Sequence, residues 1–143
     1  MSTEDNKAVV QRAFDSMTEG PKAFEAEHDA IYDPSLAGHF AGMPLVGIEM
    51  HRQFGLATFD AFPDLVRTVE DMVAEGDKVV ARWTSTGTHA GLFMGIPPTG
   101  KTIMTSGITV FRFNDAGRIV EEWSESDMVG MLQQVGAMPS PGG

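Results

Sequence analysis

The chain has 143 residues, 42% of them hydrophobic and 21% charged, which is ordinary for a single globular domain. Its net charge of −10 argues against nucleic acid and anionic membrane surfaces as partners. The absence of cysteine excludes a disulfide framework, a thiolate nucleophile and Cys-ligated zinc. An acidic N-terminus and the lack of an apolar run that could span a bilayer lead us to expect a cytoplasmic protein.

The first half of the chain is predicted to form three helices. Ser2 or Thr3 can cap the first helix, which runs to about Thr18. Apolar residues recur at helical spacing in two further helices, over residues 21–30 and 48–61. The segment 31–47 between them carries Pro and Gly throughout, so we predict an irregular segment there.

The second half reads as strands, rich in Val, Ile, Thr and Phe and separated by turn residues. About four antiparallel strands are predicted, over 65–73, 78–89, 101–114 and 118–126. Gly107 inside the third strand suggests a bulge or bend. Helices followed by an antiparallel meander are typical of α+β proteins. We expect a curved sheet around the helices, forming a cone that is open at one end.

Asp127 lies where a strand period changes to a helix period. Residues 119–126 alternate as a strand, whereas Met128, Met131, Leu132 and Val135 follow helical spacing. Gly136 then stands where a left-handed helix C-cap is expected. Asp127 can therefore be the N-cap of this helix. Alternatively, its carboxylate is held at the strand end and faces a pocket between sheet and helix.

Two familiar kinds of site find no support. Residues 95–102, GIPPTGKT, match the phosphate-binding loop pattern, but Pro97 and Pro98 have no N–H to offer a phosphate. A strand rather than a helix is predicted to follow, so we expect no nucleotide binding. The four histidines, at positions 28, 39, 51 and 89, show no pair at metal-ligand spacing, and no metal site is predicted.

Three other side chains leave alternatives open. Arg82 lies in the middle of a strand, where it either faces solvent or pairs with a buried carboxylate. Trp123 belongs to the core or lines a pocket. His89 ends its strand at a position we expect at the rim of the cone, where it is either solvated or contacts a ligand.

Several motifs together resemble the SnoaL-like polyketide cyclases, also known as ester cyclases. They are AFPDL at 61–65, EGDKVVARWTSTGTHAGLFMGIPPTGK at 75–101, GITVFRF at 107–113 and GRIVEEWSESDMVGMLQQVG at 117–136. The resemblance implies one domain over residues 1–136 with the NTF2-like cone: a curved antiparallel or mixed sheet wraps the N-terminal helices around a central apolar pocket. The Pro- and Gly-rich tail, residues 137–143, is predicted to be disordered.

The resemblance also implies a homodimer without metal or cofactor. In this family the aspartate after the last strand is the general acid and base of an intramolecular aldol condensation of an anthraquinone-type polyketide methyl ester. Asp127 matches that aspartate, and His89 of the GTH motif is expected to join it as a catalytic group. We expect contacts with a small apolar or polycyclic substrate from the side chains of His39, Arg82, Trp123, Met50, Phe54, Phe62 and Phe111.

Two other functions are compatible with this fold. The first is a hydrolase or isomerase, for example one that opens an epoxide with water activated by Glu125 and Asp127 while Arg82 orients them. The second is a protein without enzymatic activity that binds an apolar ligand.

Overall fold

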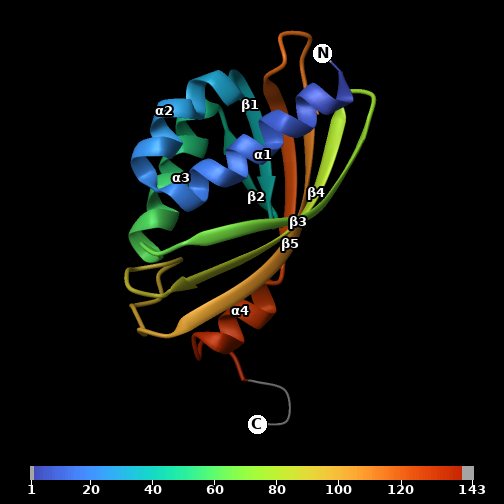
Figure 1. The fold of residues 1–143 in the computed structure, drawn as a ribbon. Coiled ribbons are helices and arrows are strands. Elements are labelled where there is room, and N and C mark those ends of the chain that lie inside the picture. The colour runs from blue at the N-terminus through green and yellow to red at the C-terminus, as the bar shows by residue number, and fades with distance from the viewer. Residues whose placement is uncertain (1, 140–143) are drawn as a thin grey trace.

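The computed structural model describes residues 2–139, in which a curved six-stranded sheet wraps around helices on one face (Figure 1). The helices are α1 (Thr3–Glu19), α2 (Pro21–Ile31), α3 (Ile48–Ala61) and α4 (Met128–Gln134). The strands are β1 (Tyr32–Phe40), β2 (Met43–Val46), β3 (Val66–Glu75), β4 (Lys78–Thr88), β5 (Thr102–Phe113) and β6 (Ile119–Ser126). The α+β cone predicted from the sequence is confirmed.

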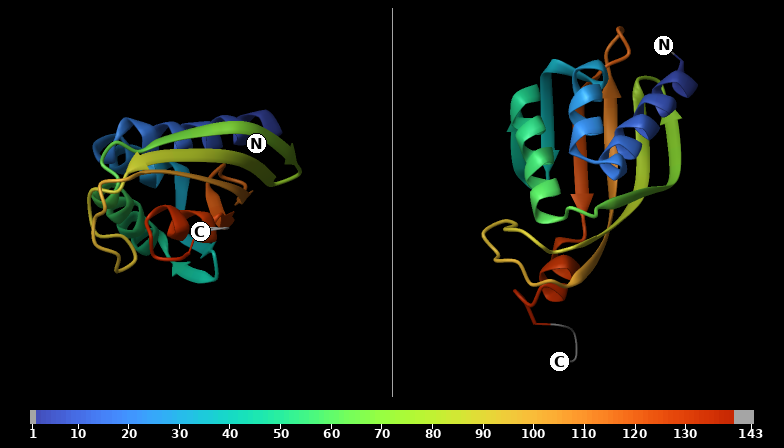
Figure 2. Two further views of the ribbon diagram at one scale, coloured as in Figure 1. Left: turned by 90° about the horizontal axis from the view of Figure 1, so that it is seen from below. Right: turned by 60° about the vertical axis from the view of Figure 1, so that its left-hand side comes forward.

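The sheet is mixed. Its strand order is β2-β1-β6-β5-β4-β3, and all neighbours are antiparallel except β1 and β6, which are parallel. Helices α1, α2 and α3 lie together against one face, whereas α4 follows β6 at the opposite end of the molecule from the N-terminus (Figure 2). The end of β6 and the helix α4 that follows it therefore lie at the open end of the cone.

The helix starts follow the predicted capping chemistry. The Ser2 hydroxyl accepts a hydrogen bond from the Asp5 backbone N–H at 3.0 Å, and the Asp5 carboxylate accepts one from the Ser2 N–H at 3.1 Å. Pro21 occupies the first turn of α2, where its missing N–H costs nothing. Gly136, with a φ of 84°, follows α4 as expected for a left-handed helix end.

The prediction of an irregular segment at residues 31–47 is wrong, because this segment forms strands β1 and β2. Proline is tolerated there because Pro34 lies in a break of the β1–β6 ladder, between the pairs Tyr32–Ile119 and Ala37–Glu121. The break leaves no ladder hydrogen bond that the missing proline N–H would have to make. These two strands raise the sheet from the four strands predicted to six.

Gly107 does not form the predicted bulge, since its pairing with Trp83 continues an unbroken β4–β5 register. A Cβ at this position would overlap the Trp83 ring and lie 2.7 Å from the carbonyl oxygen of Glu125. The glycine therefore allows an indole to lie against the strand. The sheet is irregular elsewhere, for example in β3 between Val69 and Asp71.

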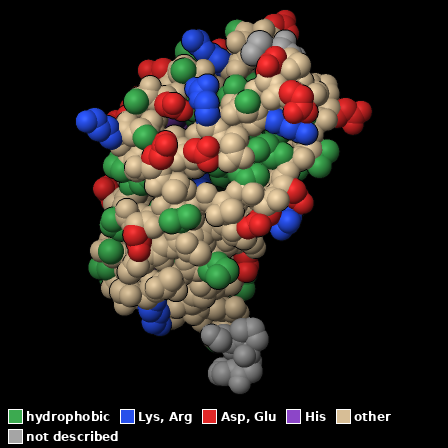
Figure 3. Space-filling view, viewed as in Figure 1, with side chains coloured by type: hydrophobic (Ala, Val, Ile, Leu, Met, Phe, Trp, Pro, Cys, Tyr) green, Lys and Arg blue, Asp and Glu red, His purple; other side chains and the backbone are tan. Residues whose placement is uncertain are grey.

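Two groups of buried apolar side chains form the core. One group joins α1 to the sheet and includes Val10, Phe14, Val79 and Phe111, all at most 5% exposed. The other joins α2, α3 and α4 and includes Phe24, Phe59, Phe62, Ile103 and Met131. Charged side chains of both signs are scattered over the helical part of the surface (Figure 3). Within residues 2–139, no helix has both the length and the apolar character needed to cross a bilayer.

Candidate active site

A cavity of about 410 Å³ lies between the helices and the inner face of the sheet. Its walls are mostly aromatic and aliphatic, with Phe14, Phe24, Phe40, Phe54, Phe62, Trp83, Phe93 and Phe111 among them. This volume lies within the range of small-molecule sites in proteins, which combine apolar walls with a few polar groups. The central apolar pocket predicted for the cone is thus present.

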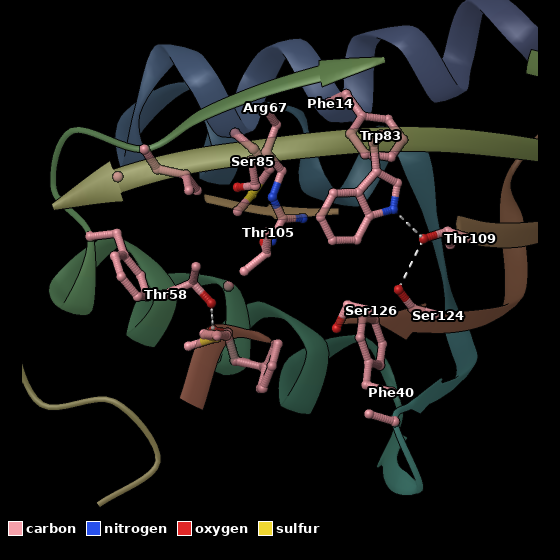
Figure 4. Close-up of a pocket in the computed structure, with 18 of the residues that line it drawn as sticks. Phe14, Phe40, Thr58, Arg67, Trp83, Ser85, Thr105, Thr109, Ser124 and Ser126 are labelled. Atoms are coloured by element: carbon pink, nitrogen blue, oxygen red, sulfur yellow. Dashed lines mark hydrogen bonds between the residues drawn. The ribbon is translucent and has the colours of Figure 1, made fainter. Parts of the chain in front are cut away.

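The polar groups of the cavity come mainly from alternate residues of the inner strands. On β6, Glu122, Ser124 and Ser126 line the cavity. The Thr109 hydroxyl accepts a hydrogen bond from Nε1 of Trp83 at 3.0 Å and lies 2.9 Å from Oγ of Ser124 (Figure 4). This chain of hydrogen bonds fixes the indole ring against the cavity wall.

Glu122 is the one carboxylate among the residues that line the cavity. It is 3% exposed, and its Oε1 lies 2.6 Å from Nε2 of His51, which is 7% exposed. The contact has the distance of an ion pair, but its direction does not complete a hydrogen bond to Oε1. Nδ1 of His51 in turn lies 2.8 Å from Nε2 of His28 on α2. Helix α2, helix α3 and strand β6 thereby contribute one residue each to a His28–His51–Glu122 chain that ends in the cavity.

His28, the member of this chain farthest from the cavity, is neutral near pH 7. Burial, followed by the nearby charges of His51 and Arg52, lowers the pKa of His28 from 6.5 to about 4. When Glu122 is ionised its oxygens only accept, so Nε2 of His51 must carry a proton. Nδ1 of a neutral His51 then accepts a hydrogen bond from Nε2–H of His28. Tyr32 packs on His51 with 4.4 Å between ring centroids, and burial together with Glu122 raises its pKa well above 10.

Arg67 supplies the cationic group of the cavity wall. Its guanidinium carbon lies 5.1 Å from the centre of the Trp83 ring, and Figure 4 shows the side chain directed inward between Trp83 and Thr105. Burial lowers the pKa of Arg67, whereas the proximity of Tyr32 and Glu122 opposes that change. Arg67 is half-buried and lines the cavity.

The predicted cap at Asp127 is confirmed. Its Oδ1 accepts a hydrogen bond from the Gly130 N–H at 2.8 Å at the start of α4. The side chain does not line the cavity, but borders a second depression together with Arg82 and Glu125. The catalytic role assigned to Asp127 stays a prediction. The arginine of this depression pairs with Asp71 at 3.3 Å rather than with Glu125 or Asp127, so nothing here favours epoxide opening.

His89 does not lie at a solvated rim, because its side chain is fully buried at 0% exposure. Its Nδ1 lies 3.0 Å from the Thr99 hydroxyl, and its ring packs beside Phe62 at 5.7 Å between centroids. Its backbone pairs with Lys101 and Gly100. These contacts tie the 90–100 loop to the end of β4. The predicted catalytic role of His89 is not tested by them.

Of the predicted substrate contacts, Phe54, Phe62 and Phe111 line the cavity, whereas His39, Met50, Arg82 and Trp123 do not. The cause for Trp123 is the alternation of β6, in which Glu121, Trp123 and Glu125 point away from the cavity that Glu122, Ser124 and Ser126 line. His39 stacks on Trp123 with 5.6 Å between centroids and lies 2.9 Å from Glu121. Met50 is 49% exposed. A role of these four residues in binding stays a prediction.

Sequence reasoning missed Tyr32, His28, His51, Arg67 and Glu122. The alternation of β6 separates Glu122 from Trp123, but does not say which set faces inward. His28 and His51 meet from two helices with no motif to connect them. Among residues 2–139, no group of three or more His, Asp or Glu side chains is arranged to hold a metal ion.

Comparison with known proteins places the chain in a family. Residues 8–135 match the family described as SnoaL-like polyketide cyclase. A candidate SnoaL-like polyketide cyclase from Jannaschia sp. CCS1 has a similar structure, with a TM-score of 0.88 and 28% identity over 96% of this chain and 95% of that one. A search of curated protein sequences finds no match.

Two Streptomyces proteins are also similar. IdmH, a candidate polyketide cyclase from Streptomyces antibioticus, is 30% identical over 92% of this chain and 98% of its own, with a TM-score of 0.78. AclR, a candidate hydroxylase from Streptomyces galilaeus, is 28% identical over 97% of this chain and 85% of its own, with a TM-score of 0.83. The fold, the enclosed cavity and the match over residues 8–135 together show that the chain belongs to the SnoaL-like polyketide cyclase family, with the NTF2-like fold.

Proposed function

We propose that the protein catalyses a cofactor-independent intramolecular aldol condensation of a polyketide-type ester, with Glu122 as the general acid and base. The observation that supports this proposal is a buried carboxylate inside an apolar, ligand-sized cavity, held at 2.6 Å from the imidazole of His51. General acid–base catalysis needs such a group within reach of the proton that moves.

The chemistry requires two proton transfers and one new bond. A carbon between two carbonyl groups is acidic, so the Glu122 carboxylate can take its proton and leave an enolate. The enolate carbon attacks a second carbonyl carbon of the same molecule, forming a C–C bond as the C=O π bond becomes an alkoxide. The alkoxide then takes the proton back from Glu122. The product is an isomer of the substrate, and the enzyme returns to its starting state.

The remaining groups position the two partners of the reaction. The imidazole of His51, with Nε2 at 2.6 Å from Oε1, keeps the Glu122 carboxylate in place. The aromatic walls formed by Phe14, Trp83 and Phe111 offer flat apolar surfaces for a polycyclic substrate. Holding both ends of one flexible molecule in this volume favours ring closure over attack by water.

Deuterium exchange tests the first half of the reaction separately from ring closure. The protein is incubated in D2O with an anthraquinone-type polyketide methyl ester, and NMR follows loss of the proton between the two carbonyls. We expect enzyme-dependent exchange that Glu122→Gln abolishes. Glu125→Gln is the matched control, because this exposed carboxylate lies on the same strand but outside the cavity. Exchange that survives in Glu122→Gln would contradict the proposal. Saturable binding without exchange in the wild type would identify a ligand-binding protein instead.

A further inference from the structure

We infer that the ligand of the cavity carries an acidic oxygen, such as that of a phenol or enol, and that this oxygen binds as an anion to the guanidinium of Arg67. The inference deepens the proposed function and rests on it for the cavity being the substrate site. It names the group of the ligand that Arg67 would recognise, which is one ionised oxygen.

Hydrogen bonds fix the backbone of Arg67, and its guanidinium lies against Trp83. On the backbone, its N–H donates to the Thr18 hydroxyl at 2.8 Å and its carbonyl accepts from the same hydroxyl at 3.2 Å, which joins β3 to α1. On the side chain, the guanidinium faces the Trp83 ring, whose own N–H is bound by Thr109. A cation fixed in this way binds a ligand with little loss of side-chain freedom.

This cation has no partner of its own in residues 2–139. No carboxylate lies within 4.0 Å of it, and its buried Nε makes no hydrogen bond. Four of the other arginines, Arg12, Arg52, Arg82 and Arg112, each pair with a carboxylate, and the fifth, Arg118, is exposed to solvent. A guanidinium has five N–H donors and no acceptor, and burying it unpaired is costly. An anionic group of a ligand would therefore supply the partner that this cation lacks.

The other ionisable groups on the cavity wall are not unpaired cations that await an anionic ligand. They are Tyr32 on β1, His51 on α3 and Glu122 on β6. Glu122 is already engaged by His51 at 2.6 Å, and Tyr32 stays neutral because burial raises its pKa well above 10. An anionic ligand oxygen would form charge-assisted hydrogen bonds to Arg67 while its rings lie along Phe14 and Trp83.

Three anthraquinone probes test the inference without any turnover: 2-hydroxyanthraquinone, its methyl ether 2-methoxyanthraquinone, and anthraquinone-2-carboxylate. The visible spectrum of the first reports whether its bound phenol is ionised. We expect the bound phenol to ionise at a lower pH than the free one. Arg67→Met should weaken its binding by roughly 10- to 100-fold and leave binding of the methyl ether unchanged. Preference for the carboxylate over the phenol would identify a carboxylic acid as the source of the anion.

The controls separate this inference from the proposed reaction. Arg118→Met removes an exposed arginine outside the cavity and should change none of the three affinities. If Arg67→Met does not fold, the comparison of phenol binding with methyl ether binding in the wild type still tests the inference. A bound phenol that ionises at the same or a higher pH than the free one would overturn the inference, as would failure of all three probes to bind. Anion binding with no deuterium exchange would leave the inference standing and remove the proposed reaction.

Discussion

The imidazole of His51 on α3 meets the carboxylate of Glu122 on β6 at 2.6 Å, with both side chains less than 10% exposed. This contact joins a helix to the inner face of the sheet at the cavity wall. Nδ1 of His51 is engaged by His28, so the ring is held at both nitrogens. Variants of the His51–Glu122 pair can therefore test both its contribution to stability and its role in the reaction.

Removing one member of the pair should destabilise the protein more than removing both. His51→Leu leaves Glu122 buried without its partner, and such losses cost about 3–5 kcal/mol. The double variant His51→Leu/Glu122→Met replaces the pair by apolar groups and should recover most of that free energy of unfolding. Urea unfolding of the wild type, both single variants and the double variant gives the coupling energy. If the losses of unfolding free energy in the two single variants simply add in the double variant, the two side chains are not a buried, coupled pair.

His28 makes stability depend on pH. Its pKa is lowered to about 4 in the folded protein and is about 6.5 when unfolded. Between these values the unfolded chain binds more protons, so the free energy of unfolding rises with pH. Above pH 6.5 the contribution is fully present, and it is lost as the pH falls to about 4. Each pKa unit corresponds to about 1.4 kcal/mol, so the lowered pKa of His28 changes the free energy of unfolding by at most roughly 3–4 kcal/mol across this pH range.

The matched variant for this prediction is His28→Gln, whose amide can still donate to Nδ1 of His51. Exposed carboxylates titrate alike in both proteins, so the difference between the two pH profiles isolates His28. We expect urea unfolding to show a smaller slope between pH 4 and 6.5 in the variant. Parallel profiles would show that His28 is not held neutral by burial.

A homodimer is predicted to form through the face of the sheet that the helices leave open. Ile108 is 49% exposed and Met104 is 61% exposed there, on outward positions of β5. Light scattering at micromolar concentration should give twice the chain mass, and Ile108→Lys should shift the protein toward the monomer. A wild-type monomer under these conditions would show that the prediction is wrong.

The sequence was most informative where structure is local. Helix periods, the capping residues Ser2 and Asp127, and the turn residues between antiparallel strands predict elements that the structure contains. These signals depend on residues a few positions apart, so one sequence is enough to recognise them. They were sufficient for the α+β cone, whereas the central pocket was implied by the resemblance to the SnoaL-like family.

The errors arose where distant segments meet. Strand β1 forms because its partner β6 lies about 80 residues later and runs parallel to it, which no local pattern indicates. A glycine inside a strand predicts a bulge or bend, but Gly107 accommodates the ring of Trp83 on the neighbouring strand, and this approach is invisible in the sequence. The His28–His51–Glu122 chain and the unpaired Arg67 depend on which strand face turns inward, and that choice is made by packing of the whole domain.

The most direct measurement compares cyclisation by Glu122→Gln and Asp127→Asn, each with its melting temperature. Asn caps a helix about as well as Asp, so Asp127→Asn keeps the α4 cap that Gly130 completes. We expect Glu122→Gln to lower turnover of a polyketide methyl ester by roughly 10²–10⁴-fold, whereas Asp127→Asn leaves it unchanged. The reverse result, with activity lost in Asp127→Asn and retained in Glu122→Gln, would contradict the role of Glu122 and assign proton transfer to Asp127.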